Sequence, residues 1–244
     1  MKRAILLLLI ALTVGATLRA RPTRQQKTEG HGTRKTNFGV KLGFNSTMFL
    51  VSDFKIKDVT IDGIQNNYKI GYFGAFFMRV NGNRHFVQPE VSYNISRCEI
   101  SFDKLGSQHP DIEPEYASVS STIRSVDVPL LYGYHLIKEG PYGMSLFVGP
   151  KLRYIWAKQN AIRFDNFDQK GIHEELYPLT MNVVVGVSIN ISRIFFDFRY
   201  EQGLHNISKS VTYDSVNPDG STGLSDITFK RRDNVLSFSL GVIF

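Results

Sequence analysis

Hydrophobic and polar residues alternate with a period of two in eight segments of this chain, and the C-terminal segment shows the pattern most simply. Its bulky side chains share one face and its small side chains share the other. The bulky positions are Leu236, Phe238, Leu240, Val242 and Phe244, and the small ones are Ser237, Ser239 and Gly241. A period of two is typical of a β-strand with one apolar face, so each segment predicts a strand. No helical period of useful length follows the first 20 residues.

The predicted strands have the lengths and connections of a membrane barrel. They span residues 37–45, 69–80, 86–95, 125–134, 144–156, 181–189, 193–202 and 235–244. A tilted strand needs roughly 9–11 residues to cross a bilayer, which these segments supply. Short turns at 81–83, 138–143 and 189–192 alternate with long polar stretches at about 46–68, 96–124, 158–179 and 203–232. The alternation predicts an up-and-down barrel with its short turns and both termini in the periplasm.

A soluble barrel also shows this periodicity, with the apolar face turned inward. An eight-stranded lumen holds only a packed set of side chains or one small ligand, and roughly forty bulky side chains would not fit it. The opposite faces carry small residues such as Gly39, Gly43, Gly71 and Ala75. We therefore expect an all-β protein, an eight-stranded antiparallel transmembrane barrel of the outer-membrane type, with its bulky faces in lipid.

The inward face then carries nine charged residues of both signs. They are Lys41, Arg79, Glu90, Asp127, Lys151, Arg153, Asp197, Arg199 and Glu201. Ionised groups in a narrow lumen are costly unless they are paired. We expect a plug-like network with no open pore, and a proton or solute path is the alternative.

The N-terminus divides into two segments before the barrel. Residues 1–20 begin with Lys2 and Arg3, continue with an apolar run and end in small residues, the pattern of a signal peptide. Residues 21–36 form a polar, basic stretch that we expect to be a flexible periplasmic tail. The barrel domain is then 37–244. The net charge of +7 falls once the cationic signal peptide is removed, and the remainder does not indicate a nucleic-acid partner.

Candidate chemistry is sparse. Cys98 is the single cysteine, so no internal disulfide forms. The six histidines fall in the tail, at turns or in loops, without the spacing of metal ligands, and no nucleotide-binding or hydrolase motif occurs. We expect no cofactor, no metal and no catalytic group. The basic turn 230–232 either faces lipopolysaccharide phosphates or is simply solvated.

Four stretches and the terminal Phe244 resemble a known family. FVQPEVSYN (86–94), SVDVPLLYGY (125–134), LFVGPKLRYIW (146–156) and FFDFRYEQGLHNI (195–207) are similar to the PorT-type outer-membrane β-barrels of the Bacteroidota. The resemblance implies an accessory role in type IX secretion, which exports cargo with a C-terminal signal, such as gingipain-type proteases. It also implies a monomeric barrel within a larger assembly, since eight strands are too narrow to pass a folded protein.

The C-terminal positions Phe238, Leu240, Val242 and Phe244 resemble the signal that the barrel-assembly machinery recognises. Outer-membrane lipid, lipopolysaccharide and other type IX components are the expected partners. Two other functions stay open: a small structural or adhesive barrel whose long loops bind ligands, and a lipid A-modifying barrel enzyme.

Overall fold

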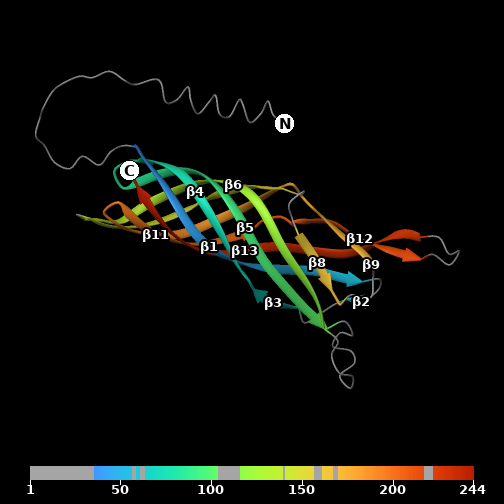
Figure 1. The fold of residues 1–244 in the computed structure, drawn as a ribbon. Coiled ribbons are helices and arrows are strands. Elements are labelled where there is room, and N and C mark those ends of the chain that lie inside the picture. The colour runs from blue at the N-terminus through green and yellow to red at the C-terminus, as the bar shows by residue number, and fades with distance from the viewer. Residues whose placement is uncertain are drawn as a thin grey trace, which may run out of the picture. The chain divides into compact units, whose positions relative to one another are not determined.

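The computed structural model describes residues 36–56, 59–60, 64–103, 116–139, 141–156, 161–166, 170–216 and 222–244, and these form an antiparallel β-structure (Figure 1). The strands are β1 (Thr36–Ile56), β2 (Val59–Thr60), β3 (Gln65–Tyr68), β4 (Ile70–Asn81), β5 (His85–Asp103), β6 (Tyr116–Glu139), β7 (Tyr142–Ile155), β8 (Ala161–Asp165), β9 (Lys170–Leu176), β10 (Leu179–Ile191), β11 (Ile194–Gly203), β12 (Ser208–Val216) and β13 (Thr222–Ile243). The predicted signal peptide, 1–20, and all of the predicted tail except Thr36 lie outside the described residues. No helix in the described part of the chain is long and apolar enough to cross a membrane.

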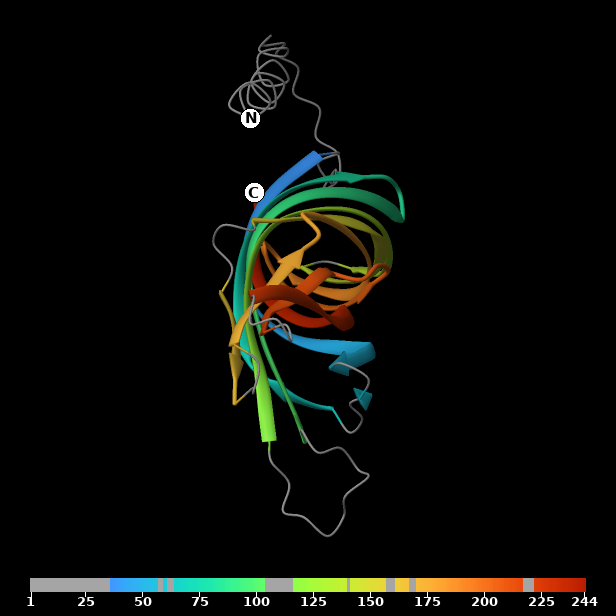
Figure 2. The ribbon, with the colours of Figure 1, turned by 90° about the vertical axis from the view of Figure 1, so that its right-hand side faces the viewer.

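Eight of these strands close into a ring, which Figure 2 shows nearly end-on. Each pairs antiparallel with the next in the order β1, β4, β5, β6, β7, β10, β11, β13, and β13 pairs with β1. The seam between β1 and β13 ends in two reciprocal backbone hydrogen bonds between Phe38 and Phe244. Every predicted segment lies on one of these strands, so the predicted eight-stranded up-and-down barrel is confirmed.

Burial alternates along the strands in the predicted sense. Leu42 exposes 74% of its surface on the outside of β1, whereas its neighbour Lys41 exposes 2% inside. Large apolar side chains on the outside recur on every strand of the ring, including Phe76, Leu130, Val185 and Phe238. An exterior this apolar is stable only in contact with lipid.

Four phenylalanines fill the lumen at the end of the barrel that carries the short connections between β4 and β5, β6 and β7, and β10 and β11; we call this the turn end. Each ring lies over a glycine directly opposite on the paired strand, so the four pairs use all eight strands. The pairs are Phe77 with Gly39, Phe86 with Gly133, Phe147 with Gly186, and Phe195 with Gly241. The glycines leave room for four rings that would otherwise not fit a lumen this narrow.

The long polar stretches between the predicted strands are not mainly loops, which corrects the sequence analysis. β1, β5, β6 and β13 run for 21, 19, 24 and 22 residues, about twice what a membrane span requires. The inward alternation continues there with buried side chains such as Phe49, Ile100 and Phe229. The outward face of these extensions carries polar residues, so the sequence there resembles a loop although the strands continue.

At the far end, opposite the turn end, the ring divides into two sheets. β3, β5, β6 and β8 form one, the β6 sheet, and β9, β12, β13, β1 and β2 form the other, the β13 sheet. In Figure 1 the green ends of β5 and β6 diverge from the orange and red ends of β12 and β13. Buried residues of both sheets pack into one apolar group, the far-end cluster. Its members include Phe49, Ile100, Phe102, Val119, Ile123, Val211, Tyr213 and Phe229.

The Phe–Gly pairs make a prediction about stability. A Cβ at Gly133 would lie 2.0 Å from the Phe86 ring, which is held between Arg79 and His135. We expect Gly133→Ala to lower the free energy of unfolding by about 1–3 kcal/mol through overpacking. Denaturant unfolding in lipid vesicles, followed by the fluorescence of Trp156, measures the change.

Gly74→Ala is the matched control. Gly74 lies on the lipid face of β4, and the nearest atom to an added Cβ is the flexible end of Leu42 at 3.2 Å. Stability equal to that of the wild type is expected for Gly74→Ala. Equal losses of unfolding free energy in Gly133→Ala and Gly74→Ala would show that the four phenylalanine rings at the turn end are not tightly packed.

Candidate functional site: a plugged lumen

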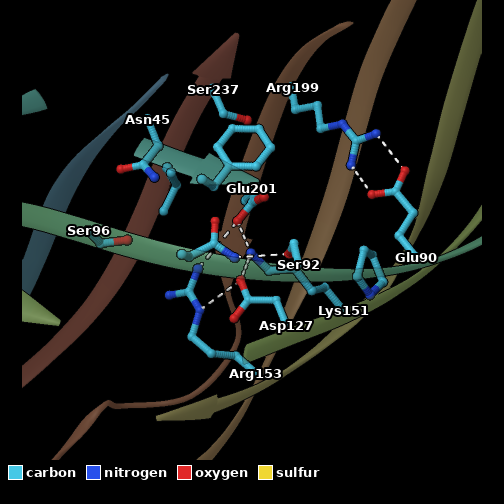
Figure 3. A pocket seen from close by; sticks show the side chains of 14 residues that line it. Asn45, Glu90, Ser92, Ser96, Asp127, Lys151, Arg153, Arg199, Glu201 and Ser237 are labelled. Atoms are coloured by element: carbon cyan, nitrogen blue, oxygen red, sulfur yellow. Dashed lines mark hydrogen bonds and ion pairs between the residues drawn. The ribbon is translucent and has the colours of Figure 1, made fainter. Parts of the chain in front are cut away.

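The structure buries all nine charged residues that the sequence analysis placed inside. Their exposed fractions run from 0% for Asp127 to 8% for Glu201, and they lie on six strands of the ring. They meet in two groups, one centred on Glu90 and the other on Lys151 and Arg153 (Figure 3). We call these the Glu90 network and the Lys151 network.

Glu90 is the acceptor of the first network. Lys41 Nζ lies 2.9 Å from both of its carboxylate oxygens, and the two terminal nitrogens of Arg199 donate to them at 2.8 and 2.7 Å. Asp197 accepts from Arg199 at 2.7 Å and from Lys41 at 3.3 Å. The bidentate pairing of Arg199 with Glu90 fixes the geometry of a buried ion pair.

Arg79 joins the same network through an amide. Its Nε donates to Gln88, and the amide nitrogen of Gln88 donates to Glu90. The guanidinium lies 4.4 Å from the centre of the Phe86 ring and 5.7 Å from that of Phe77. The aromatic faces stabilise this buried cation. The Glu90 network is therefore in direct contact with the phenylalanine rings at the turn end.

The side chains of the Lys151 network come from β6, β7, β11 and β13. Lys151 pairs with Asp127 at 2.8 Å and closely with Glu201. Arg153 pairs with the same two carboxylates at 3.3 and 3.4 Å and makes a close contact with Asp233. Figure 3 shows the two cations and Asp127 converging from β6 and β7. Shared carboxylates neutralise several cations at once, which is what a narrow lumen requires.

A small cavity separates the two networks. Asn45, Ser92, Ser96 and Ser237 line it together with the charged groups, and its volume is about 20 Å³. This is room for one or two water molecules. Among the described residues, paired side chains therefore fill the lumen at this level and leave only this cavity between the two networks.

Three further charged side chains lie inside that the sequence analysis missed. They are Arg231, Asp233 and Glu174. Arg231 donates to Glu174 at 2.9 Å and to Ser121 at 3.0 Å, and its guanidinium lies 4.1 Å from the Phe49 ring. Residues 230–232 are thus not a turn but part of β13, with Lys230 and Arg232 outside and Arg231 inside. Extending the alternation of the last strand backward by two-residue steps from Ser237 would have placed Asp233 and Arg231 correctly.

With these residues, the buried charges balance in the part of the chain that the structure describes. The cations are Lys41, Arg79, Lys151, Arg153, Arg199 and Arg231, and the acids are Glu90, Asp127, Glu174, Asp197, Glu201 and Asp233. An equal number of each sign allows every buried charge to be compensated nearby. The arrangement suits a structural plug and carries no excess charge that would select one ion.

Of the remaining candidate residues, His31 and His109 lie outside the described residues. His135 lies on β6, not in a loop, and contacts Ser145 Oγ at 2.8 Å; His173 lies on β9. In the part of the chain that the structure describes, no three His, Cys, Asp or Glu residues could hold a metal ion. Cys98 is buried among apolar residues of the far-end cluster. The C-terminal positions Phe238, Leu240, Val242 and Phe244 face outward at the end of the chain, where β13 pairs with β1 and closes the ring.

A closed eight-stranded ring with a lipid-facing apolar exterior and a plugged lumen defines an outer-membrane β-barrel. Comparison with protein families agrees. The family described as "Outer membrane protein beta-barrel domain" matches residues 23–209, and the chain belongs to it. No curated protein matches the chain at a significant level.

Solved outer-membrane proteins share the fold. OprG from Pseudomonas aeruginosa superposes with a TM-score of 0.54 at 12% identity, covering 87% of this chain and 98% of OprG. Ail, the attachment invasion locus protein of Yersinia pestis, is similar with a TM-score of 0.37 at 10% identity, covering 86% of this chain and 99% of Ail. At this level of identity, the likeness to OprG supports the outer-membrane barrel fold and nothing further.

The Glu90 network makes a second prediction. Glu90→Gln removes one of the two carboxylates that Lys41 and Arg199 share, so that both cations depend on Asp197 alone, and breaking a buried ion pair costs about 3–5 kcal/mol. We expect the free energy of unfolding to fall by that amount. The double variant Glu90→Gln/Arg199→Met should lose less than the sum of the two single losses, since the two residues act on each other.

Glu175→Gln is the control, because Glu175 pairs with Lys209 on the exposed surface at 3.0 Å. An exposed pair contributes little, so no measurable change in stability is expected. Additive losses in the double variant would contradict the proposed coupling of Glu90 and Arg199.

Cys98 makes a third prediction. The outward neighbours Arg97 and Glu99 are charged, so Cys98 lies beyond the apolar belt. Burial raises the pKa of its thiol to about 11. At pH 8 only about one thiol in a thousand is then ionised, and the group is shielded as well. We expect a thiol reagent to label Cys98 only in the unfolded protein.

A Cys98→Ser/Asn83→Cys variant supplies the control, because Asn83 is exposed in the turn between β4 and β5. Its thiol should react at once in the folded barrel. Equally rapid labelling of folded wild-type protein would show that the far-end cluster is open.

Proposed function

We propose that this barrel is a non-enzymatic outer-membrane component of the type IX secretion system, needed for the export and maturation of cargo with a C-terminal signal, such as gingipain-type proteases. The sequence resemblance supports this role: the stretches 86–94, 125–134, 146–156 and 195–207 and the terminal Phe244, together with the basic tail, resemble PorT. The family match and the fold supply the outer-membrane barrel on which the proposal depends.

The plugged lumen is the observation that carries the proposal. A polypeptide cannot pass a lumen that two ionic networks fill, with a cavity of only about 20 Å³ between them, and whose turn end is filled by four phenylalanine rings. Whatever the barrel contributes to secretion must therefore come from its outer surfaces. An accessory or assembly role beside a larger pore fits this constraint.

The proposed orientation places the turn end and the N-terminus in the periplasm. β1 begins and β13 ends at the turn end, with Phe38 bonded to Phe244. Short periplasmic turns and longer external connections are the rule for such barrels. The far-end sheets then project outside the cell, and the segment before Thr36 is available to periplasmic partners.

Outer-membrane lipid, lipopolysaccharide and other type IX components are the proposed partners of a monomeric barrel. Lys230 and Arg232 support the lipopolysaccharide contact, since both face outward on β13 while Arg231 points inside. Exposed cations at this level can pair with phosphates of the outer leaflet.

One observation favours a second candidate, an adhesive barrel. β1, β5, β6 and β13 extend well beyond the length that lipid requires. Such a projecting surface suits ligand binding. Trimming only residues 104–115 would test this while leaving β5, which ends at Asp103, and β6, which begins at Tyr116, intact.

A clean in-frame deletion tests the secretion role. The extracellular and periplasmic amounts of C-terminal-signal cargo are compared in the deletion strain, the wild type and a strain with the gene restored on a plasmid. We expect unprocessed cargo to accumulate in the periplasm of the deletion strain and export to return with the plasmid.

The same strains separate the alternatives. Normal cargo export with a changed lipid A mass would overturn the secretion role in favour of an enzyme. Normal export with loss of ligand binding on trimming 104–115 would favour the adhesive barrel. Restoring with Glu175→Gln, which changes one exposed pair, controls for expression and should rescue export fully.

A further inference from the structure

A pocket lies in the far-end wall where β12 meets β13. On β13, the pairing with β11 stops at Asn234, and the pairing with β12 begins at Ile227. Between these points six residues of β13, 228–233, run beside eight residues of the neighbouring segment, 203–210. Segments of unequal length cannot stay in register, and a pocket of about 330 Å³ lies beside them. We call it the β12/β13 pocket.

The inner side of this pocket is apolar and its outer side is polar. Val211, Ile227 and Phe229, which are buried members of the far-end cluster, line the inner side. Thr228 and Tyr177, which are exposed, line it as well. A tyrosine combines an apolar ring with a polar hydroxyl. Such a mixed lining suits a sugar, whose ring has apolar C–H faces and a polar edge of hydroxyl groups.

Two buried polar atoms of the pocket have no hydrogen-bond partner among the described residues. They are the Oγ of Ser208, a residue that is only 7% exposed, and the Oδ1 of Asn206. Buried polar atoms are almost always hydrogen-bonded, so these two need an external partner. A hydroxyl group can donate or accept, whereas a carbonyl oxygen accepts only. Hydroxyl groups of a ligand satisfy both.

Two lysines make the pocket electropositive. Lys209 and Lys230 line it, and no carboxylate does so among the described residues. Each lysine has an acidic neighbour outside the pocket: Lys209 lies 3.0 Å from Glu175, and Lys230 lies 3.7 Å from Asp53. Exposed pairs of this kind are weak. A phosphate that enters the pocket therefore competes well for both ammonium groups through charge-assisted hydrogen bonds.

The height of the pocket above the lipid belt restricts which lipid reaches it. The outward side chains of β13 are apolar as far as Leu236 and polar from Asn234 on, and Lys230 lies six residues past Leu236. Six residues of a strand tilted by 35–45° rise by about 15 Å. A phospholipid headgroup layer is only about 5–8 Å deep. Among membrane lipids, the one that reaches this pocket has a saccharide headgroup.

We propose that the β12/β13 pocket binds a phosphorylated sugar of the lipopolysaccharide headgroup. Lys209 and Lys230 hold the phosphate, and Ser208 and Asn206 bond the sugar hydroxyls. The proposal rests on the lipopolysaccharide contact and the orientation given under the proposed function, with the far end outside the cell, and does not need the secretion role. A free sugar phosphate has the same chemistry, so the test separates the two sources.

The test uses the full-length barrel in phospholipid nanodiscs that contain no lipopolysaccharide. Core-type lipopolysaccharide is fully deacylated to a soluble phosphorylated oligosaccharide and titrated into the barrel by isothermal calorimetry. We expect one site per barrel. The same oligosaccharide after chemical dephosphorylation should bind at least about tenfold more weakly, since it loses charged hydrogen bonds. Glucose 1-phosphate should also bind at least about tenfold more weakly, because it offers one sugar only.

Each of these ligands can overturn the proposal. Absence of binding by the phosphorylated oligosaccharide would remove the site. Equal binding by the dephosphorylated oligosaccharide would contradict the role of the two lysines. Equal binding by glucose 1-phosphate, or by inorganic phosphate, would contradict lipopolysaccharide as the source.

Variants connect binding to the pocket. Lys230→Gln should weaken binding by about tenfold through loss of a charged hydrogen bond. Thr228→Trp, at an exposed position, should fill the pocket and abolish binding. Lys69→Gln is the matched control, because Lys69 is an exposed cation outside the pocket that pairs with Glu99 at 3.2 Å. Binding by Lys69→Gln should equal that of the wild type.

Folding of each variant is checked by its mobility on unheated gels. Equal weakening by Lys69→Gln and Lys230→Gln would show a general effect of net charge and overturn the site. Undiminished binding by a folded Thr228→Trp variant would overturn it as well.

The orientation is tested apart from the pocket and from secretion. A membrane-impermeant thiol reagent should label a Cys98→Ser/Thr228→Cys variant on intact cells. Absence of labelling would place the far end in the periplasm and overturn the proposal. Cargo export in the deletion strain bears on the secretion role alone, so the failure of one proposal is distinguishable from the failure of the other.

Discussion

The structure depends on one constraint: a ring of eight strands encloses a lumen that must be filled by its own side chains. Three devices fill it in succession. Phenylalanine rings over glycines close the turn end, two ionic networks occupy the middle, and apolar residues from two sheets close the far end. The same constraint sends the bulky apolar residues outward, where only lipid can cover them. Fold, membrane environment and plug therefore have a common physical origin.

Because the lumen is filled, we expect the barrel to act through its outer surfaces. The ionic networks are stable because most of their carboxylates pair with two cations, as Glu90 and Asp127 do, and such shared pairs hold neighbouring strands at fixed distances. Rigidity of the wall in turn presents the far-end sheets in a defined position. A rigid scaffold with projecting strands is suited to holding partners, and this is the role that both proposals assign to it.

Much of this architecture was predictable from the sequence, because period-two alternation specifies strand and face together. The alternation placed Lys41, Glu90 and Arg199 inside correctly, and the volume of the lumen decided which face meets lipid. The strand ends were not predictable, since solvent-facing polar residues beyond the membrane resemble a loop. The contacts between side chains of different strands were not predictable either. The pairing of Arg231 with Glu174 and the Phe–Gly pairs depend on the register between strands, which the sequence of one strand does not contain.

The central claim is that the lumen is closed by paired side chains, and single-channel recording tests it most directly. Purified full-length barrel is incorporated into a planar lipid bilayer, with a large porin as the positive control for incorporation and detection. The account predicts no steady current from the wild type, at low or high salt, because the Glu90 and Lys151 networks leave no continuous water path. A steady, reproducible single-channel current from correctly folded wild-type protein would contradict it.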